Sequence, residues 1–225
     1  TTIPENYIRI ELEPLEPGYE VVPYSERLQW LISHELVHIV INDMASSFES
    51  SMRSVTGKVN PDKLQPLTVF YSLITNHNRY TPRWYQEAIA VFIETWFSGG
   101  YGRILGNFDE MYFRSLVYDD QNFASASEIE NITSHENILL ENILYLYGTR
   151  FIAHISNKYG AQKLYEWFSL KPDEFYPGLE SKFEKIYGLD FTEAWENFIL
   201  DEKEFQNSNI SLIKKYPQTD YKRLS

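Results

Sequence analysis

The sequence predicts a mostly α-helical α+β fold with a small sheet near the N-terminus. Apolar residues make up 43% and aromatic residues 16% of the 225 residues, a composition that supports a large folded core and excludes overall disorder. Apolar side chains recur at helical spacing through most of the chain, and residues that favour helix starts and stops flank these stretches. One stretch near the N-terminus, Tyr7–Leu12, alternates apolar and polar side chains as a β-strand does.

Composition also narrows the classes of function. The chain carries 32 acidic and 20 basic residues, and its formal net charge of −12 argues against a nucleic-acid or anionic-membrane surface. Cysteine is absent, so any metal must be bound by histidine and carboxylate. The sequence contains no run of 18 apolar residues, so we expect no membrane insertion by this segment. The chain begins without Met or a leader, from which we expect a mature product or a piece of a longer protein that has further domains.

The elements follow from apolar periodicity and from the residues that begin and end each stretch. A strand is expected at Ile8–Leu12, followed by an irregular segment rich in proline. Residues 45–66 are rich in serine and turn residues and predict a long surface excursion with little regular structure. Residues 207–225 are polar and predict a tail or linker. The predicted helices lie at about 25–42, 67–75, 82–97, 109–117, 138–159, 161–168, 179–187 and 190–205.

The strongest functional signal is His34-Glu35-Leu36-Val37-His38, inside the helix predicted at 25–42. Residues four apart lie about 40° from each other around a helix, so the imidazoles of His34 and His38 share a face. Two such imidazoles can bind one Zn²⁺ at about 2.0–2.1 Å each. Glu35 lies about 100° around the helix from His34, where it can hold a metal-bound water without being a ligand. The competing interpretation is a helix that carries these residues by chance.

A catalytic zinc site needs a third protein ligand and an open fourth position. The helix predicted at 82–97 offers Glu87 on a side that is otherwise apolar. Because a carboxylate in such a place needs a partner or solvent, we predict that Glu87 is the third ligand. The alternative is an ordinary exposed helix glutamate.

Together the two helices resemble the gluzincin zinc metallopeptidases, in particular the peptidase-MA-like group. The resemblance rests on His-Glu-x-x-His and on a second helix with the pattern Pro-x-Trp-x-x-Glu-Ala-x-Ala-x-x-x-Glu. It implies a zincin-like catalytic domain with one Zn²⁺ per chain, bound by His34, His38 and Glu87, and Glu35 as general base. Glu94 matches the second glutamate of the pattern and is expected to orient a ligand or solvent, the alternative being a solvated helix end.

A tyrosine on a later helix is the second catalytic candidate. Relatives carry Tyr-x-x-Gly after the metal segment, with the tyrosine hydrogen-bonded to the oxyanion, and this pattern matches Tyr145. Tyr147 lies about 200° away around the helix, so the two cannot both face the zinc. His154 shares a face with Tyr147 and resembles the histidine that plays this part in thermolysin-like enzymes, so three candidates stay open. His77 and His135 lack spaced partners and are expected at the surface.

The chain also departs from the family's pattern. Glu87 follows His38 by 49 positions, a longer interval than in thermolysin-type enzymes and gluzincin aminopeptidases, and Gln86 stands where many relatives have Asn. The Gly-x-Met-Glu-Asn segment that grips the substrate N-terminus in the aminopeptidases does not precede the second helix, which argues against an aminopeptidase. A glycine-rich loop at 99–102 is expected to line the cleft, with Arg103 available to a substrate carboxylate.

The resemblance therefore implies an endopeptidase that hydrolyses peptide bonds of peptide or protein substrates with metal-activated water. The alternatives are an aminopeptidase-like exopeptidase and a non-catalytic zinc-binding or scaffold module of a larger protein. The predicted catalytic domain spans residues 1–206, with the metal helices in 25–97 and a helical subdomain in 107–206. Relatives with attached domains are often exported, which favours an extracytoplasmic location.

Overall fold

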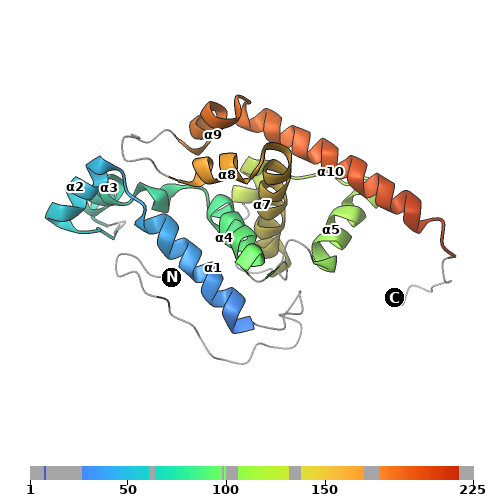
Figure 1. The fold of residues 1–225 in the computed structure, drawn as a ribbon, viewed down its shortest axis with the longest axis horizontal. Coiled ribbons are helices and arrows are strands. Elements are labelled where there is room, and N and C mark those ends of the chain that lie inside the picture. Colours follow the sequence, from blue (N-terminus) through green and yellow to red (C-terminus); the bar gives the residue numbers. More distant parts are fainter. Residues whose placement is uncertain are drawn as a thin grey trace.

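The computed structural model of the protein describes residue 8 and residues 27–60, 64–97, 99, 106–131, 138–169 and 178–217. These residues are mostly helical, and no β-strand occurs among them (Figure 1). The longer helices are α1 (Arg27–Asp43), α4 (Arg83–Phe97), α5 (Asn107–Tyr118), α7 (Ile138–Tyr159) and α10 (Phe191–Ile213). The shorter ones are α2 (Ser47–Thr56), α3 (Pro66–Thr75), α6 (Ala126–Glu130), α8 (Ala161–Phe168) and α9 (Leu179–Tyr187), with a 3₁₀ turn η1 (His77–Tyr80).

Helices α4 and α7 lie side by side at the centre of the molecule, with α1 against α4 (Figure 1). Helix α4 is apolar almost all round, and most of its side chains are buried, as expected for a central helix. Trp84 contacts the rings of Phe151 on α7 and of Phe191 and Trp195 on α10 at centroid distances of 5.4–6.2 Å. This aromatic core fixes α4 and α7 relative to each other, and the candidate site lies beside it.

Gly148 on α7 allows α4 and α7 to approach closely. A Cβ atom at this position would lie 2.8 Å from Cβ of Ala88 and 3.0 Å from the carbonyl oxygen of Trp84. Such a contact is too short for any side chain, so the helix spacing requires glycine here. Tyr145 lies one turn before Gly148, on the side of α7 that faces α4, and the Tyr-x-x-Gly pattern is therefore a packing motif as well.

Capping side chains determine where several helices begin. The carboxylate of Glu130, on α6, accepts hydrogen bonds from the backbone nitrogens of Arg83 and Trp84 at the start of α4 (3.1 and 3.4 Å). Asp190 accepts from the second and third residues of α10 in the same way. Acceptors at these positions satisfy amide groups that have no partner within the helix, and a carboxylate also complements the helix dipole.

The prediction of a mostly helical protein is confirmed, and the helices expected at 67–75, 82–97, 109–117 and 179–187 are present within one or two residues. The expectation of little regular structure at 45–66 is wrong, because Ser46 and Glu49 form a reciprocal capping box that starts α2. The predicted end of the last helix near residue 205 is also wrong, since α10 continues to Ile213, into the segment expected to be a tail. The strand predicted at Ile8–Leu12 lies, apart from Ile8, outside the described residues.

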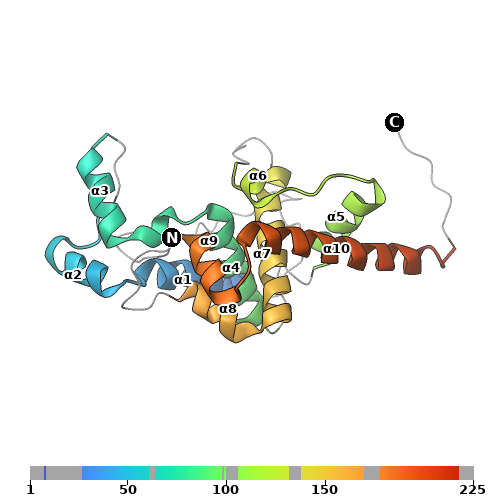
Figure 2. The same cartoon turned by 90° about the horizontal axis from the view of Figure 1, so that it is seen from above.

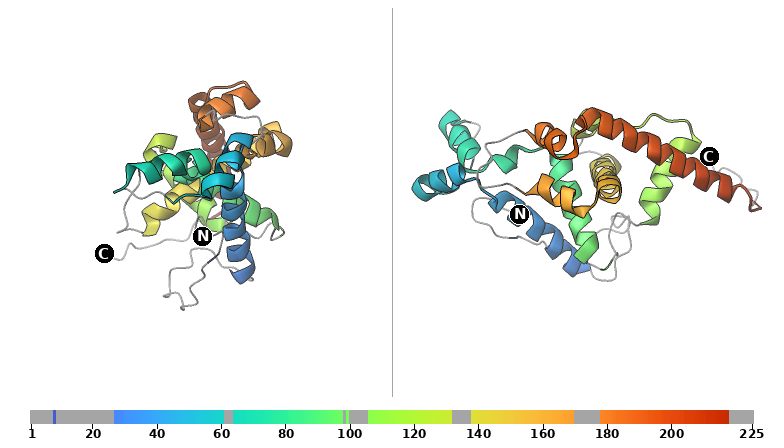
Figure 3. Two further views of the ribbon diagram at one scale, coloured as in Figure 1. Left: turned by 90° about the vertical axis from the view of Figure 1, so that its left-hand side faces the viewer. Right: turned by 45° about the horizontal axis from the view of Figure 1, so that its top comes forward.

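Helices α2 and α3 extend from the end of α1, away from the central helices (Figures 2 and 3). Together with η1 they fill the interval between α1 and α4 in the sequence. The 49 positions that separate His38 from Glu87 thus include α2, α3 and η1. Among the helices that the structure describes, none is long and apolar enough to cross a membrane.

Candidate metal centre

Helix α1 presents His34 and His38 toward α4, and both side chains are buried. Their Nε2 atoms lie 3.1 Å apart, and their rings meet edge to face. The four-residue spacing explains why they share a face, and the contact between α1 and α4 explains why that face is buried.

Glu87 of α4 completes a triangle of ligand atoms. Its Oε2 lies 3.1 Å from Nε2 of His34 and 3.4 Å from Nε2 of His38. Ligands placed tetrahedrally at about 2.0–2.1 Å from a zinc ion are roughly 3.3 Å from one another. The three predicted ligands are thus brought together at separations that suit one small metal ion, and no other set of this kind occurs among the described residues.

Glu94, one helical repeat beyond Glu87, is fully buried, and its Oε2 lies 2.8 Å from Nδ1 of His34. A carboxylate can only accept, so Nδ1 of His34 is the donor, and Nε2 of the neutral ring then carries a lone pair. A carboxylate behind a metal-binding histidine fixes its tautomer and ring orientation. Glu94 is therefore buried against His34, so the alternative of a solvated helix end is wrong, and its role in orienting a metal ligand stays a prediction.

The charges at the triangle favour a cation. With the tautomer that Glu94 selects, Nε2 of His34 and Oε2 of Glu87 both present lone pairs to the same point. Burial alone would raise the pKa of Glu87, but protonated His34 and His38 donate hydrogen bonds to this carboxylate and attract it, and they hold that pKa well below its usual range. The carboxylate is therefore ionised at neutral pH. A bound cation would take the place of those protons between the same atoms. Buried acceptors that face one another are stabilised by a shared positive charge, so the donor set suits a divalent cation such as zinc.

A polar pocket of about 390 Å³ opens at the triangle. Glu35, half-buried, lines it beside the two histidines without belonging to the triangle, as the sequence predicts for a base. The other lining residues come from α1, η1, α4 and α7. The pocket is lined by His34, Glu35, His38, Asn42, Arg79, Gln86, Glu87 and Tyr145.

The structure separates the three candidates on α7. Tyr145 lines the pocket, whereas Tyr147 is buried in the aromatic core, where its hydroxyl accepts a hydrogen bond from the backbone nitrogen of Ala124 (3.1 Å) and burial raises its pKa. His154 faces α10, packs on Phe198 and lies 3.7 Å from Asp201. Of the three, Tyr145 alone is brought to the pocket.

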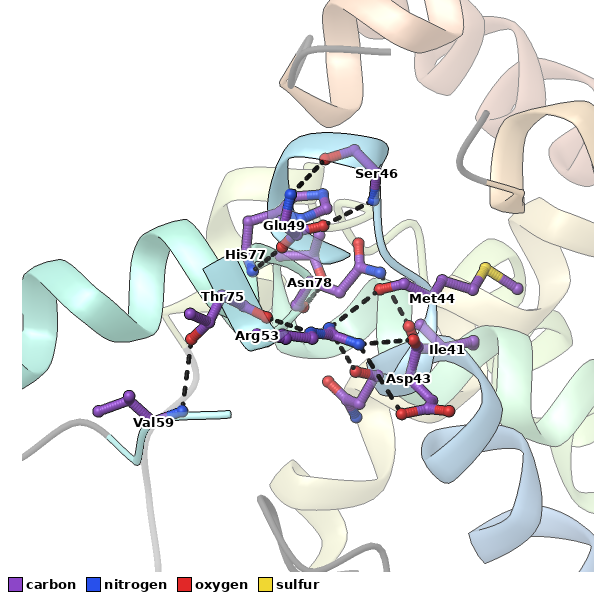
Figure 4. Close-up of polar contacts among 12 residues, drawn as sticks. Ile41, Asp43, Met44, Ser46, Glu49, Arg53, Val59, Thr75, His77 and Asn78 are labelled. Atoms are coloured by element: carbon purple, nitrogen blue, oxygen red, sulfur yellow. Dashed lines mark hydrogen bonds and ion pairs between the residues drawn. The ribbon is translucent and has the colours of Figure 1, made fainter. Parts of the chain in front are cut away.

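The pair of helices α2 and α3 is fastened to the end of α1 (Figure 4). The guanidinium of Arg53 donates to the carbonyl oxygens of Asp43 and Met44 at the C-terminus of α1 and to that of Thr75 at the end of α3. A cation there satisfies carbonyls that have no partner within the helix and complements the helix dipole. Arg53 therefore ties α2 and α3 to the C-terminal end of α1.

His77, predicted at the surface, is half-buried and paired. Its Nδ1 lies 3.0 Å from Oε1 of Glu49, and its backbone nitrogen donates to the same oxygen (Figure 4). Glu49, itself fully buried, thereby connects α2 to η1. The expectation for His77 is wrong because its partner comes from another helix, 28 positions away. His135 and Arg103 lie outside the described residues.

Sequence reasoning missed two residues of the pocket and the role of a third. Asn42 follows His38 by one helical turn, and the same spacing that pairs the histidines could have revealed it. Gln86 donates from Nε2 to the carbonyl oxygens of Asn78 and Thr81 (3.0 and 3.2 Å), which fastens η1 to the start of α4. Arg79 is placed by η1, and no local pattern in the sequence indicates it.

Comparison of the chain with protein-family models, with curated proteins and with solved structures finds no match. The functional argument therefore depends on the residues of this site and their geometry.

Proposed function

We propose that the protein is a zinc-dependent metallopeptidase, an endopeptidase that acts on peptide or protein substrates. The observation that carries the proposal is the convergence of His34, His38 and Glu87 at mutual distances of 3.1–3.4 Å. Its support comes from Glu94 behind His34 and from Glu35 and Tyr145 in the pocket at the triangle. We propose one Zn²⁺ per chain at this point.

A bound zinc ion supplies a Lewis acid that polarises a carbonyl oxygen and lowers the pKa of water toward about 7. In the proposed reaction Glu35 accepts a proton from the water that attacks the scissile carbonyl carbon. It then returns this proton to the nitrogen of the leaving amine as the C–N bond breaks. The hydroxyl of Tyr145 donates a hydrogen bond to the oxygen on which negative charge develops. Glu94 keeps the ring of His34 oriented throughout.

A non-catalytic zinc-binding module is the competing function. A purely structural zinc site is closed by four protein ligands. Here three candidate ligands face a pocket that also contains a carboxylate outside the triangle, which favours a catalytic site. An exopeptidase would use the same triangle and differ only in how the substrate ends are bound.

Glu35→Gln tests the proposal. The substitution keeps the side-chain size and both histidines, but an amide cannot accept the proton. We expect zinc content near one ion per chain by elemental analysis, and a fall of about 10²–10⁴-fold in cleavage of fluorescent casein and of an unbiased peptide library. Equal cleavage by both proteins would contradict the role of Glu35, and the absence of cleavage by the zinc-loaded wild type would favour the non-catalytic module.

Tyr145→Phe and Tyr147→Phe form a matched pair in the same assays. Loss of the Tyr145 hydroxyl removes one donor to the developing oxyanion and should lower kcat on the order of 10²-fold. Loss of the Tyr147 hydroxyl removes a core hydrogen bond and should lower stability by about 1 kcal/mol while leaving kcat unchanged. A larger loss of kcat in Tyr147→Phe would contradict the assignment of Tyr145.

A further inference from the structure

Arg79 lies at the metal pocket and is placed there by both metal helices. It belongs to η1 and lines the same pocket as the three candidate ligands. Asn78 beside it donates from Nδ2 to the carbonyl oxygen of Ile41 on α1 (2.8 Å), and Gln86 on α4 donates to the carbonyl oxygen of Asn78 (3.0 Å). The backbone that carries Arg79 is thus fixed to α1 and to α4.

The guanidinium of Arg79 is available to a ligand. Within the described part of the chain it forms neither a hydrogen bond nor an ion pair, whereas the guanidinium of Arg53 is bound to several carbonyl oxygens. Arg79 is also the one lysine or arginine among the described lining residues of the pocket. A guanidinium offers planar, paired donors that match a carboxylate.

Asn42 supplies a second feature in the same pocket. Its Nδ2 donates to the carbonyl oxygen of His38 (2.8 Å), while its Oδ1 is buried and has no partner among the described residues. A buried amide oxygen without a partner is uncommon in folded proteins and calls for a donor from water or a ligand. Asn42 lies one turn beyond His38, so such a donor would lie next to the metal ligands.

We propose that Arg79 and Asn42 form a subsite for a peptide carboxylate beside the metal triangle. Arg79 binds the carboxylate, and Oδ1 of Asn42 accepts a hydrogen bond from a peptide N–H of the same substrate. The carboxylate is either the C-terminus of the substrate or an acidic side chain near the scissile bond. This inference rests on the proposed function, because it assigns substrate selection to the same site.

Chelating peptides test the subsite without requiring turnover. Three short peptides carry an N-terminal hydroxamate that binds zinc and end in alanine with a free carboxylate, in alaninamide, or in glutamic acid α-amide. Their affinities for the zinc-loaded protein are measured by calorimetry. We expect at least one carboxylate peptide to bind roughly tenfold to a hundredfold more tightly than alaninamide, the range for a hydrogen bond to a charged group. Which of the two does so identifies the source of the carboxylate.

Arg79→Gln should abolish this preference while the affinity for the alaninamide peptide and the zinc content stay unchanged. Arg83→Gln is the matched control, because it removes the same charge from an exposed position that does not line the pocket, and it should keep the preference. Asn42→Ala should lower the affinity for all three peptides by a similar factor, since all three contain the peptide N–H that Asn42 is proposed to bind.

Equal affinities for the three peptides in the wild type, or no binding of any of them, would overturn the proposal. An equal loss of preference in Arg79→Gln and Arg83→Gln would overturn it as well, because general electrostatics would then explain the effect. Cleavage assays distinguish this failure from failure of the proposed function. If the preference depends on Arg79 but no peptide is ever cleaved, the subsite stands and the peptidase activity is refuted.

Discussion

Two buried polar clusters lie on different faces of α7, and they differ in the source of their positive charge. On the side of α5 and α10, Arg150 lies 2.8 Å from Glu110 and 3.5 Å from Asp109, and it forms two hydrogen bonds with Glu202. The guanidinium also contacts the aromatic rings of Phe113 and Phe205. This cluster contains its own cation, although neither buried carboxylate oxygen of Asp109 has a hydrogen-bond partner among the described residues.

The cluster on the side of α1 and α4 contains no lysine or arginine at its centre among the residues that the structure describes. Among the described residues, Glu87 forms ion pairs only with His34 and His38. Histidine is charged only when protonated, and a neutral imidazole can bind a metal ion instead. Three possible metal-ligand atoms thus converge where the other cluster has a guanidinium. The comparison teaches that a buried carboxylate by itself does not indicate function. Two histidines and a carboxylate that converge on one point are the feature on which the proposed metal site depends.

The largest effect is expected from removing the cation of the Arg150 cluster. Arg150→Met leaves three carboxylates close together without a counter-charge and should lower the free energy of unfolding by about 3–5 kcal/mol, measured by urea denaturation. Zinc binding should be unchanged, because the triangle lies on another face of α7. Arg150→Lys keeps the charge but loses the paired hydrogen bonds with Glu202, so its loss should be smaller. Equal losses in the two variants would show that shape, and not charge, determines the stability of this cluster.

The next effect concerns the cluster that lacks a cation. Glu87→Ala removes one of the three proposed ligands and should weaken zinc binding by more than about 100-fold. Removing a residue that only hydrogen-bonds to a ligand already costs about 10–100-fold in metal affinity, and removing the ligand itself should cost more. Alanine is a good helix former, so α4 should persist. Added zinc should raise the melting temperature of the wild type and not that of the variant. Full zinc occupancy of Glu87→Ala at micromolar free metal would refute the assignment of this ligand.

A smaller change in zinc affinity is expected from Glu94. Glu94→Gln keeps the shape but removes the charge that makes the hydrogen bond to Nδ1 of His34 strong. Zinc affinity should fall about tenfold to a hundredfold, measured by competition with a chromophoric chelator. An unchanged affinity would show that Glu94 only fills space in the core.

The smallest effect is the pH dependence of the Arg150 cluster. Burial raises the pKa of Asp109 to about 7, although Arg150 opposes the shift. A raised pKa means that the folded state binds the proton more tightly than the unfolded chain does. The resulting stability is present below about pH 4 and is lost as the pH rises through about 7. Relative to Asp109→Asn, the wild type should therefore lose on the order of 1 kcal/mol of stability between pH 5 and pH 8. The same difference in urea midpoint between the two proteins at pH 5 and at pH 8 would contradict this prediction.

Local sequence patterns predicted most of the helices because capping residues and apolar periodicity act within a few positions. Helix α2 was missed since its composition resembles a loop, and its start depends on the reciprocal bonds of Ser46 and Glu49. Helix α10 was predicted too short, although Gln206 at the predicted end is fully buried and donates to Glu110 of α5 (2.9 Å). In both regions, specific hydrogen bonds made by side chains stabilise a helix that composition alone does not favour.

The sequence by itself determined the pair His34 and His38, with Glu35 beside them, because one helical turn fixes their relative positions whatever the rest of the chain does. It also offered Glu87 and Glu94, one helical repeat apart, on a single face of the second helix. Only the tertiary structure decided that these two helices face each other. The packing of α4 against α7 at Gly148 brought Tyr145 to the pocket and left Tyr147 in the core. Hydrogen bonds from η1 to α1 and α4 placed Arg79 beside His34 and His38, which lie more than 40 positions from it in the sequence. Distances between helices depend on core packing, which no local pattern encodes.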